Sequence, residues 1–385
     1  MRRHLKILEY ALSSLWRRKY KNLSITLVYA FTIAVLASVL FLTHSLKTEA
    51  SRLLENAPEL VVQKLAGGRH DMIPASYGEK IRAIPGVAEV TPRFWGYYYD
   101  GLIEANYTLV AVDSGMPALE MLEGHLPGGP GECAIGAGVA AIRKVEIGDD
   151  LILVDHRNTG ISYEVTGVFR TGSELLTNDL VVLTRHDLTS FFGYADDLAT
   201  DISVSVRNPR EVTTIAEKIR RILPDTRPIS RREILQTYAG VFNWRSGMML
   251  SVFAAALVAF CILAWDKATG ISAEEKREIG ILKAIGWETS DILALKFWEG
   301  IAVSLTSLLL GLIGAYVHVF LLGASVLAPV IKGWSVLFPP FRLIPFVDFY
   351  QILVIGFLTV TPYVVSTVVP SWKASITDPE TAMRG

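Results

Sequence analysis

The chain has 385 residues, of which 51% are hydrophobic and only 19% are charged, and this composition excludes an ordinary soluble protein. Its formal net charge of -1 excludes a nucleic-acid-binding protein, which would carry a strongly basic surface. The two cysteines, Cys133 and Cys261, form no disulfide framework or cysteine metal site. These numbers favour a membrane protein with one large water-exposed domain.

The N-terminal segment, residues 1–22, is basic. It contains one acidic residue, Glu9. Its basic residues are Arg2, Arg3, Lys6, Arg17, Arg18, Lys19 and Lys21. The positive-inside rule therefore predicts a cytoplasmic N-terminus. The apolar run 23–44 is long enough to cross a bilayer and lacks a small-residue cleavage site, so we predict a retained first membrane span.

Residues 45–245 are predicted to form an extracytoplasmic domain of mixed α and β structure. Strand-like runs lie at Leu60–Gln63, Thr108–Val112, Leu151–Val154, Tyr163–Phe169, Leu180–Leu183 and Ile202–Val206. Ala75–Ile84 and Pro209–Leu223 read as amphipathic helices, and the loop Leu126–Gly131 is expected to divide two lobes.

Two flanking segments, Ser45–Asn56 and Ser230–Trp244, place apolar residues at helical spacing between charges. They predict a paired helical stalk, because helices transmit movement rigidly whereas Gly-Ser linkers do not. The alternative is that they are ragged ends of the membrane spans.

Three further apolar runs predict membrane spans at residues 246–265, 297–322 and 349–370. Counting crossings places the loop 266–296 and the tail 371–385 in the cytoplasm and the loop 323–348 outside. The predicted fold class is thus α-helical membrane protein, with four transmembrane helices and a large mixed α+β domain inserted between the first two.

The loop 266–296 contains a charged segment, residues 273–285, that predicts a short helix. Ser272 and Glu275 resemble a capping box, and Gly286 marks the end. Ile279, Leu282 and Ile285 recur at three-residue spacing and form one apolar stripe. Such a helix either docks in a groove of another protein or rests on the lipid surface.

The third predicted span carries small and polar residues on one face. These residues are Ser304, Ser307, Gly311, Gly314 and His318. Small side chains let helix backbones approach closely in lipid, so this stripe predicts helix packing. The scarcity of ionisable groups inside the spans argues against an ion-coupled transporter.

No catalytic chemistry is indicated by the remaining motifs. Gly136-Ala137-Gly138 lacks the spacing and the lysine of a phosphate-binding loop, so no ATP site is predicted. The seven histidines are scattered without metal-ligand spacing. We therefore expect no catalytic, cofactor or metal site in this chain, and no enzymatic activity.

Taken together, the motifs of the last third resemble the FtsX/MacB-like permease family, which supplies membrane subunits of bacterial ABC transporters. The likeness rests on Glu275–Gly286, Asp291-Ile292, Phe297–Gly300 and the tail from Pro370 to Arg384, where Met383 replaces the usual Leu. The outer domain matches more loosely, as a porter-like domain. Relatives fused to an ATPase would need a phosphate-binding loop, which this sequence lacks.

The resemblance implies a dimer, of one chain or two, in the bacterial cytoplasmic (inner) membrane, with both termini in the cytoplasm. A separate ABC-type ATPase would bind ATP and Mg²⁺ and dock on the charged helix. The residues implied for docking are Glu274, Glu275, Arg277, Glu278, Ile279, Gly280, Leu282, Lys283, Ile285 and Gly286. The substrate class would be a lipoprotein, lipid or peptide handled outside the membrane.

Two alternatives stay open at this point. A non-transporting FtsX-like relative would use the same ATPase to switch on a cell-wall hydrolase, with a periplasmic protein as its partner. A four-span sensor or scaffold without an ATPase would use the charged helix to bind lipid or nothing.

Overall fold

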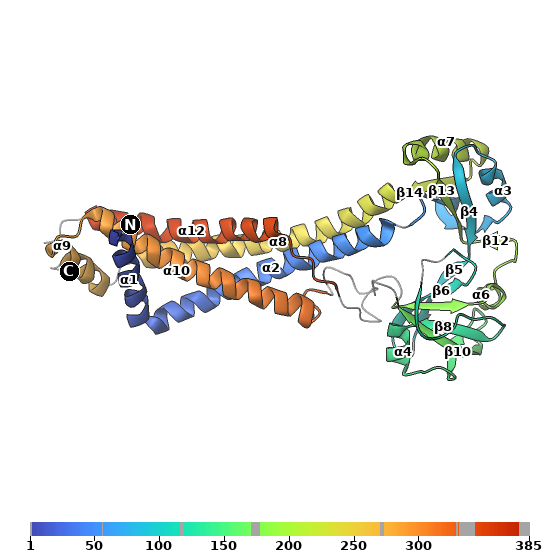
Figure 1. The fold of residues 1–385 in the computed structure, drawn as a ribbon, viewed down its shortest axis with the longest axis horizontal. Coiled ribbons are helices and arrows are strands. Elements are labelled where there is room, and N and C mark those ends of the chain that lie inside the picture. The colour runs from blue at the N-terminus through green and yellow to red at the C-terminus, as the bar shows by residue number, and fades with distance from the viewer. Residues whose placement is uncertain are drawn as a thin grey trace. The chain divides into compact units, whose positions relative to one another are not determined.

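The computed structural model describes residues 2–55, 57–115, 119–170, 178–269, 273–328, 330 and 343–376 (Figure 1). The chain divides into two compact units. The first contains Met1–His44, Trp244–Ser325 and Pro345–Gly385, and the second contains Ser45–Asn243 and Val326–Ile344.

The first unit is helical. Its helices are α1 (Arg2–Arg17), most of α2 (Lys19–Glu55), the later part of α8 (Arg231–Thr269), α9 (Ala273–Ala284), α10 (Thr289–Tyr316) with the π-helical turn η2 (Val317–Leu321), and α12 (Phe349–Ile376). Within the described residues, three helices are long and apolar enough to cross a membrane: Lys19–Arg52, Thr289–Leu321 and Phe349–Trp372. The predicted span 246–265 lies inside α8, where many side chains are not described.

Helix α10 lies at the centre of the contacts in this unit. It packs along α12, where Gly300 faces Val364 and Thr367. Helix α2 joins the same group, because the Tyr29 hydroxyl donates to the carbonyl oxygen of Thr359 over 2.5 Å. The predicted third span is therefore one part of a longer helix that already begins at Thr289, ahead of the apolar run.

The second unit is built on two main sheets. The strands are β1 (Leu60–Ala66), β2 (Arg69–Asp71), β3 (Ile73–Pro74), β4 (Val87–Arg93), β5 (Trp95–Asp100), β6 (Ala105–Ala111), β7 (Glu120–Gly124), β8 (Glu132–Gly136), β9 (Asp150–Val154), β10 (Gly160–Arg170), β11 (Leu180–Leu183), β12 (Leu198–Ala199), β13 (Asp201–Val206) and β14 (Thr226–Ser230). The helices are α3 (Tyr77–Arg82), α4 (Ala137–Arg143), α6 (Arg185–Phe192), the 3₁₀ turn η1 (Pro209–Glu211) and α7 (Val212–Ile222).

The five-stranded sheet has the order β14-β1-β13-β4, with β2 paired to β1. The seven-stranded sheet has the order β5-β6-β11-β8-β10-β7, with β9 paired to β10. It is mixed, because β11 runs parallel to β6 and antiparallel to β8. Alternating strands such as β6 bury every second side chain, and these residues join the main apolar core of the unit.

All six strands predicted from the sequence are present; the bounds of β11 agree, and those of the other five are shifted by a few residues. The predicted helix Pro209–Leu223 is present as η1 followed by α7, whereas α3 is shorter than predicted. The loop Leu126–Gly131 does not divide two lobes, which corrects the sequence analysis. It connects β7 to β8, and both strands belong to the seven-stranded sheet. Its Pro-Gly residues mark a turn within one sheet.

The chain passes between the two sheets at two neighbouring places, after β4 and before β13. Arg93 at the end of β4 binds Asp201 with two hydrogen bonds of 2.5 and 2.8 Å, and the Trp95 indole donates to the same carboxylate over 3.1 Å. Thr200 donates to the carbonyl oxygen of Trp95 over 2.7 Å. Because Asp201 is buried, these bonds compensate for its loss of water and fasten the crossing.

The ends of the two long helices meet within the second unit. Helix α2 continues to Glu55, and α8 begins at Arg231, so the flanking segments are helical as predicted. Lys47 donates to the side chain of Asn243. At the start of α8, Arg231 forms an ion pair with Glu59 at 2.7 Å.

Candidate functional site

Helix α9, Ala273–Ala284, is the segment that the sequence singles out as a docking element. It ends in a Schellman motif: the amide of Gly286 donates to Lys283 and that of Trp287 to Leu282, both over 3.0 Å. Gly286 adopts φ +99°, a conformation that other residues rarely take. The helix end is therefore encoded by Gly286, as the sequence indicates.

One face of α9 is buried inside the chain itself. Ile279 is 7% exposed and Leu282 is 5% exposed. Leu282 packs in an apolar cluster with Ile7 and Ala11 of α1 and Leu295 of α10. In the single chain both side chains are therefore covered by its own residues, and the docking role expected for Ile279 and Leu282 stays a prediction.

A neighbouring face of α9 carries two apolar side chains that are exposed. Ile281 is 51% exposed and Ile285, just beyond the helix end, is 68% exposed. The two residues are four positions apart, which places them on the same side of a helical turn. Ile285 is among the predicted docking residues. Ile281 is not, because its position falls outside the three-residue spacing on which that prediction rests.

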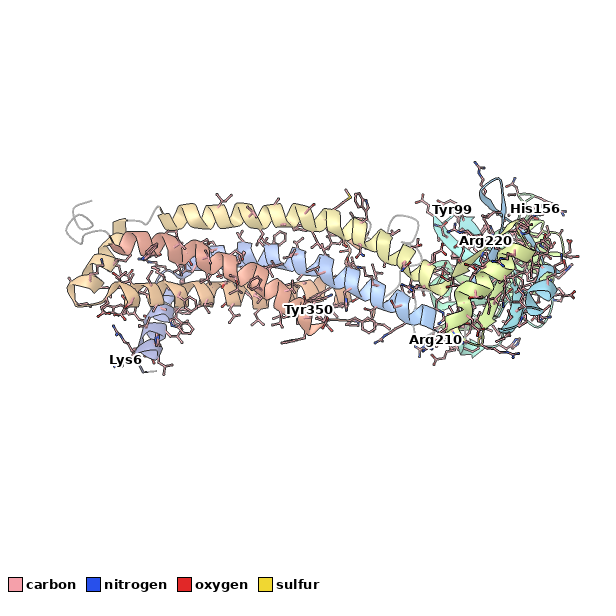
Figure 2. The ribbon with its side chains drawn as sticks, turned by 90° about the horizontal axis from the view of Figure 1, so that it is seen from above. Lys6, Tyr99, His156, Arg210, Arg220 and Tyr350 are labelled. Atoms are coloured by element: carbon pink, nitrogen blue, oxygen red, sulfur yellow. The ribbon has the colours of Figure 1, made fainter. Side chains whose placement is uncertain are left out.

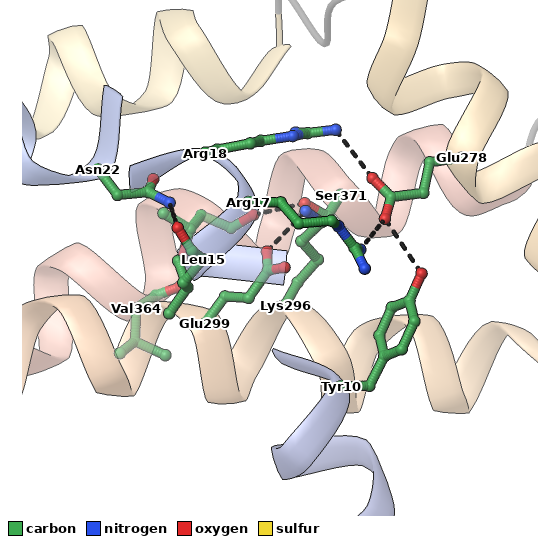
Figure 3. A network of polar contacts seen from close by, with 11 residues as sticks. Tyr10, Leu15, Arg17, Arg18, Asn22, Glu278, Lys296, Glu299, Val364 and Ser371 are labelled. Carbon is green, nitrogen blue, oxygen red and sulfur yellow. Dashed lines mark hydrogen bonds and ion pairs between the residues drawn. The ribbon is translucent and has the colours of Figure 1, made fainter. Parts of the chain in front are cut away.

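Glu278 receives three donors from the N-terminal segment (Figure 3). Its Oε1 accepts from the Tyr10 hydroxyl and from Arg17, each over 3.1 Å, and its Oε2 accepts from Arg18 over 2.8 Å. The pKa of Tyr10 is raised, first by burial and further by the neighbouring Glu278 carboxylate, while Arg17 opposes the shift. Tyr10 therefore stays protonated and donates at neutral pH.

Three predicted docking residues, Glu274, Glu275 and Arg277, have side chains outside the described part of the structure. Ser272, the predicted cap, lies in the undescribed segment 270–272. The two other predicted positions on the helix are Gly280, which is buried, and Lys283, which is half-buried.

The sequence analysis missed the part played by α1. This helix carries Ile7, Ala11 and Ser14 on one buried face, three or four residues apart, while Lys6 lies on its exposed side (Figure 2). That periodicity was available in the sequence, but the cations around it were interpreted only as an orientation signal. The amphipathic pattern predicts a packed helix, although it does not identify the packing partner.

A second contact joins α1 to the start of α10. Glu288 and Asp291 form a capping box there, in which Asp291 accepts the amide of Glu288 over 3.2 Å. Arg3 pairs with the same Asp291 over 2.5 Å. Because the Arg3 side chain is largely exposed, water screens this ion pair and limits its contribution.

The small and polar stripe of α10 faces α2. Ser307 donates to the carbonyl oxygen of Thr26 over 3.2 Å. A methyl group built on Gly311 would stand 2.7 Å from Ile33, and one built on Gly314 would stand 3.5 Å from Ala34. His318 continues the row at 3.1 Å from the Ser38 hydroxyl. Ser304 is also buried and donates to Gly300 of its own helix over 2.8 Å.

The glycine pair Gly136-Ala137-Gly138 has a structural explanation. Gly136 precedes α4, and a methyl group built on Gly138 would stand 2.3 Å from the Asn178 side chain. The glycine is therefore required for close packing. Among the described residues, no three His, Cys, Asp or Glu side chains are grouped so as to hold a metal ion.

These features define a helical membrane protein that carries a mixed α/β domain. Comparison with known families places a MacB-like periplasmic core domain at residues 25–222, which is more than half of the chain, and an FtsX-like permease C-terminal domain at residues 248–379. The chain therefore belongs to the MacB/FtsX-like family of ABC transporter permeases.

One curated relative is an uncharacterised ABC transporter permease from Methanocaldococcus jannaschii, 25% identical over 205 residues, which are 48% of each chain. The present chain thus spans about half the length of that relative. Two solved structures match just under half of this chain. The extracellular domain of the noncanonic ABC-type transporter YknZ from Gram-positive bacteria gives TM-score 0.33 and 16% identity, over 46% of this chain and 100% of that one. The periplasmic region of MacB from Actinobacillus actinomycetemcomitans gives TM-score 0.34 and 13% identity, over 47% of this chain and 92% of that one.

Proposed function

We propose that this chain is the membrane subunit of an ABC transporter that is driven by a separate ATPase, and that α9 is its docking helix. The observation that carries this proposal is that one side of α9 is buried and another is exposed. Its Ile279 and Leu282 side is fixed to the chain, while its Ile281 and Ile285 side is open. A helix with one anchored and one free apolar face suits a groove in a partner protein.

The anchored face explains how a small helix would carry force. A docking helix on flexible linkers would move without moving the membrane helices. Here Leu282 packs against α1 and α10, so displacement of α9 would be passed to α1 and to α10, and α10 is long enough to span the membrane. The energy would come from ATP bound with Mg²⁺ in the partner ATPase.

The proposal includes four membrane spans, of which α8 supplies the second, a dimer of permease chains in a bacterial inner membrane, and cytoplasmic termini. The basic N-terminal segment supports this orientation. The α/β domain would then act outside, on a lipoprotein, lipid or peptide. Between α2 and α10, Ser307 donates to the carbonyl oxygen of Thr26 and His318 contacts the Ser38 hydroxyl, and these two contacts include no Asp, Glu, Lys or Arg side chain, which supports a lever.

The test is purification of the tagged chain from native membranes in mild detergent, with identification of bound proteins and an assay of ATP hydrolysis. We expect an ATPase to be recovered with the unmodified chain and lost with the double variant Ile281→Asp and Ile285→Asp. The matched control is Ile222→Asp in α7, because Ile222 is as exposed as Ile281 but lies in the other unit.

The outcomes separate the hypotheses. Recovery of the ATPase with the double variant would refute docking through this face. Absence of any ATPase from the unmodified chain would favour the sensor or scaffold. A bound cell-wall hydrolase beside the ATPase would favour the FtsX-like regulator over transport.

A further inference from the structure

Glu278 on α9 binds the two arginines at the junction between α1 and α2. Helix α1 ends at Arg17 and α2 begins at Lys19, so Arg17 and Arg18 stand at the junction. Both arginines direct their guanidinium groups to the one carboxylate of Glu278 on α9 (Figure 3). The contact joins residues that are 260 and 261 positions apart in sequence.

The junction itself is well hydrogen-bonded. The amide of Arg18 donates to Ser14 over 3.3 Å, and the amide of Asn22 donates to Arg18 over 3.1 Å. The side-chain amide of Asn22 also donates back to the carbonyl oxygen of Leu15 over 2.9 Å. Because these bonds bridge the end of one helix and the start of the next, α1 and the first turn of α2 move together.

The acceptor capacity of Glu278 is engaged on both oxygens. Oε1 takes Tyr10 and Arg17, and Oε2 takes Arg18. Charge-assisted hydrogen bonds of this kind are stronger than neutral ones and depend on direction. Tyr10 also lies beside Trp287, with ring centroids 5.5 Å apart, directly after the turn that ends α9.

We propose that Glu278 is the positioning residue through which movement of α9 reaches α2. The inference rests on the proposed function for the source of the movement. The contact of Glu278 with Tyr10, Arg17 and Arg18, which we call the clamp, is a property of the single chain. An ATPase that displaces α9 would pull Arg17 and Arg18, and therefore the first turn of α2. Glu278 thereby belongs to force transmission, and not to the surface that the ATPase contacts.

The first experiment uses the full chain in lipid nanodiscs without any ATPase. Spin labels replace Ser13 on α1 and Ala284 on α9, two exposed positions on either side of the clamp. We expect a narrow distance distribution that broadens in Glu278→Gln, because the neutral amide loses its attraction to two arginines. The clamped population should fall on the order of tenfold.

Two controls make this result specific. Glu9→Gln removes an exposed carboxylate from α1 itself and should leave the distribution narrow. The exchanged pair Glu278→Arg with Arg18→Glu should restore part of the narrow population, which a general loss of folding would not. An unchanged distribution in Glu278→Gln would overturn the clamp.

The second experiment adds the co-purified ATPase with ATP and vanadate, and labels Leu23 in α2 and Leu358 in α12. We expect a nucleotide-dependent change in this distance that Glu278→Gln abolishes while the ATPase stays bound. Persistence of the change in Glu278→Gln would overturn the transmission role. Failure of the unmodified chain to bind an ATPase would count against the proposed function alone, since the first experiment measures the clamp without it.

Discussion

Two of the contacts between distant segments of the helical unit are made in opposite ways. The contact between α1 and α9 is built from charged groups around Glu278 above an apolar cluster at Leu282. The contact between α2 and α10 is built from small residues, with Gly311 against Ile33 and Ser307 against Thr26. The first depends on long side chains, and the second depends on backbones that approach closely.

The difference follows from the surroundings of each contact. Helices α2 and α10 are apolar enough to cross a membrane, where lipid tails compete with apolar side chains and association depends on shape. Helix α1 is basic and amphipathic, and the paired side chains of Arg17, Arg18 and Glu278 are 53%, 27% and 28% exposed, so these ion pairs form without an extreme desolvation cost. Substitutions should therefore affect the two contacts in different ways.

The largest effect is expected for Gly311→Leu. Its Cβ would lie 2.7 Å from Ile33 and 2.9 Å from the carbonyl oxygen of Ala30, and a backbone atom cannot move aside as a side chain can. We expect a loss of about 3 kcal/mol or more of stability. The measurement is the thermal unfolding midpoint of the detergent-solubilised chain.

Gly314→Ala is the matched control for this prediction. Its added methyl group meets Ala34 at 3.5 Å, which is ordinary van der Waals contact. The midpoint should stay close to that of the unmodified chain. Equal losses of thermal stability in both variants would show that the close approach of Gly311 to α2 is not what limits side-chain size along the stripe.

Leu282→Ala should have the next largest effect, because it empties the cluster shared with Ile7, Ala11 and Leu295. Truncation of a buried leucine costs about 2 kcal/mol or more. The same label pair on α1 and α9 should report release of α9. Ile281→Ala, on the exposed side of the helix, should change the distribution little, and an equal effect of the two variants would contradict the assignment of faces.

Ionic strength should separate the two contacts. The Debye length falls from about 10 Å at 0.1 M salt to about 3 Å at 1 M, so the partly exposed pairs at Glu278 weaken by roughly 1 kcal/mol or less. The contact between Ser307 and Thr26 involves no net charge and should not respond. Distance measurements on both helix pairs at two salt concentrations would show whether only the α1–α9 pair broadens.

An effect of similar size concerns Tyr10. Because its pKa is raised in the folded chain, the hydroxyl contributes stability that is fully present below its ordinary value of 10.0 and is lost as the pH rises through the raised pKa. Tyr10→Phe should cost about 1 kcal/mol at pH 7. The unmodified chain should lose stability as the pH rises through the raised pKa of Tyr10, whereas the variant should show no such step in the label distances.

Much of the architecture follows from short-range sequence patterns. The apolar runs at α2, α10 and α12 are long enough to be predicted as membrane spans from the sequence. The strand Leu180–Leu183, which is rich in branched residues, was predicted with its observed bounds. Strand β5 was missed, because its residues Trp95–Asp100 include a glycine and three tyrosines and show no clean alternation. Tyr99 is exposed (Figure 2). Tyr98 is partly buried and packs against the core.

The loop Leu126–Gly131 shows a different kind of limit. Its proline and glycine residues correctly indicate a turn, but a turn within a sheet and a boundary between lobes have the same local composition. The observed crossings lie at Arg93 and Asp201, whose pairing is 108 residues apart in sequence. No short window of sequence contains both partners.

The sequence by itself determined the helical membrane segments, the mixed α/β domain, the glycine that ends α9 and the small-residue stripe of α10, because each depends on local conformational preference or on periodicity along one element. Only the tertiary structure decided which face of α9 is occupied and that Glu278 belongs to Tyr10, Arg17 and Arg18. Periodicity shows that a helix has an apolar stripe. The identity of what covers the stripe depends on contacts between residues far apart in the chain.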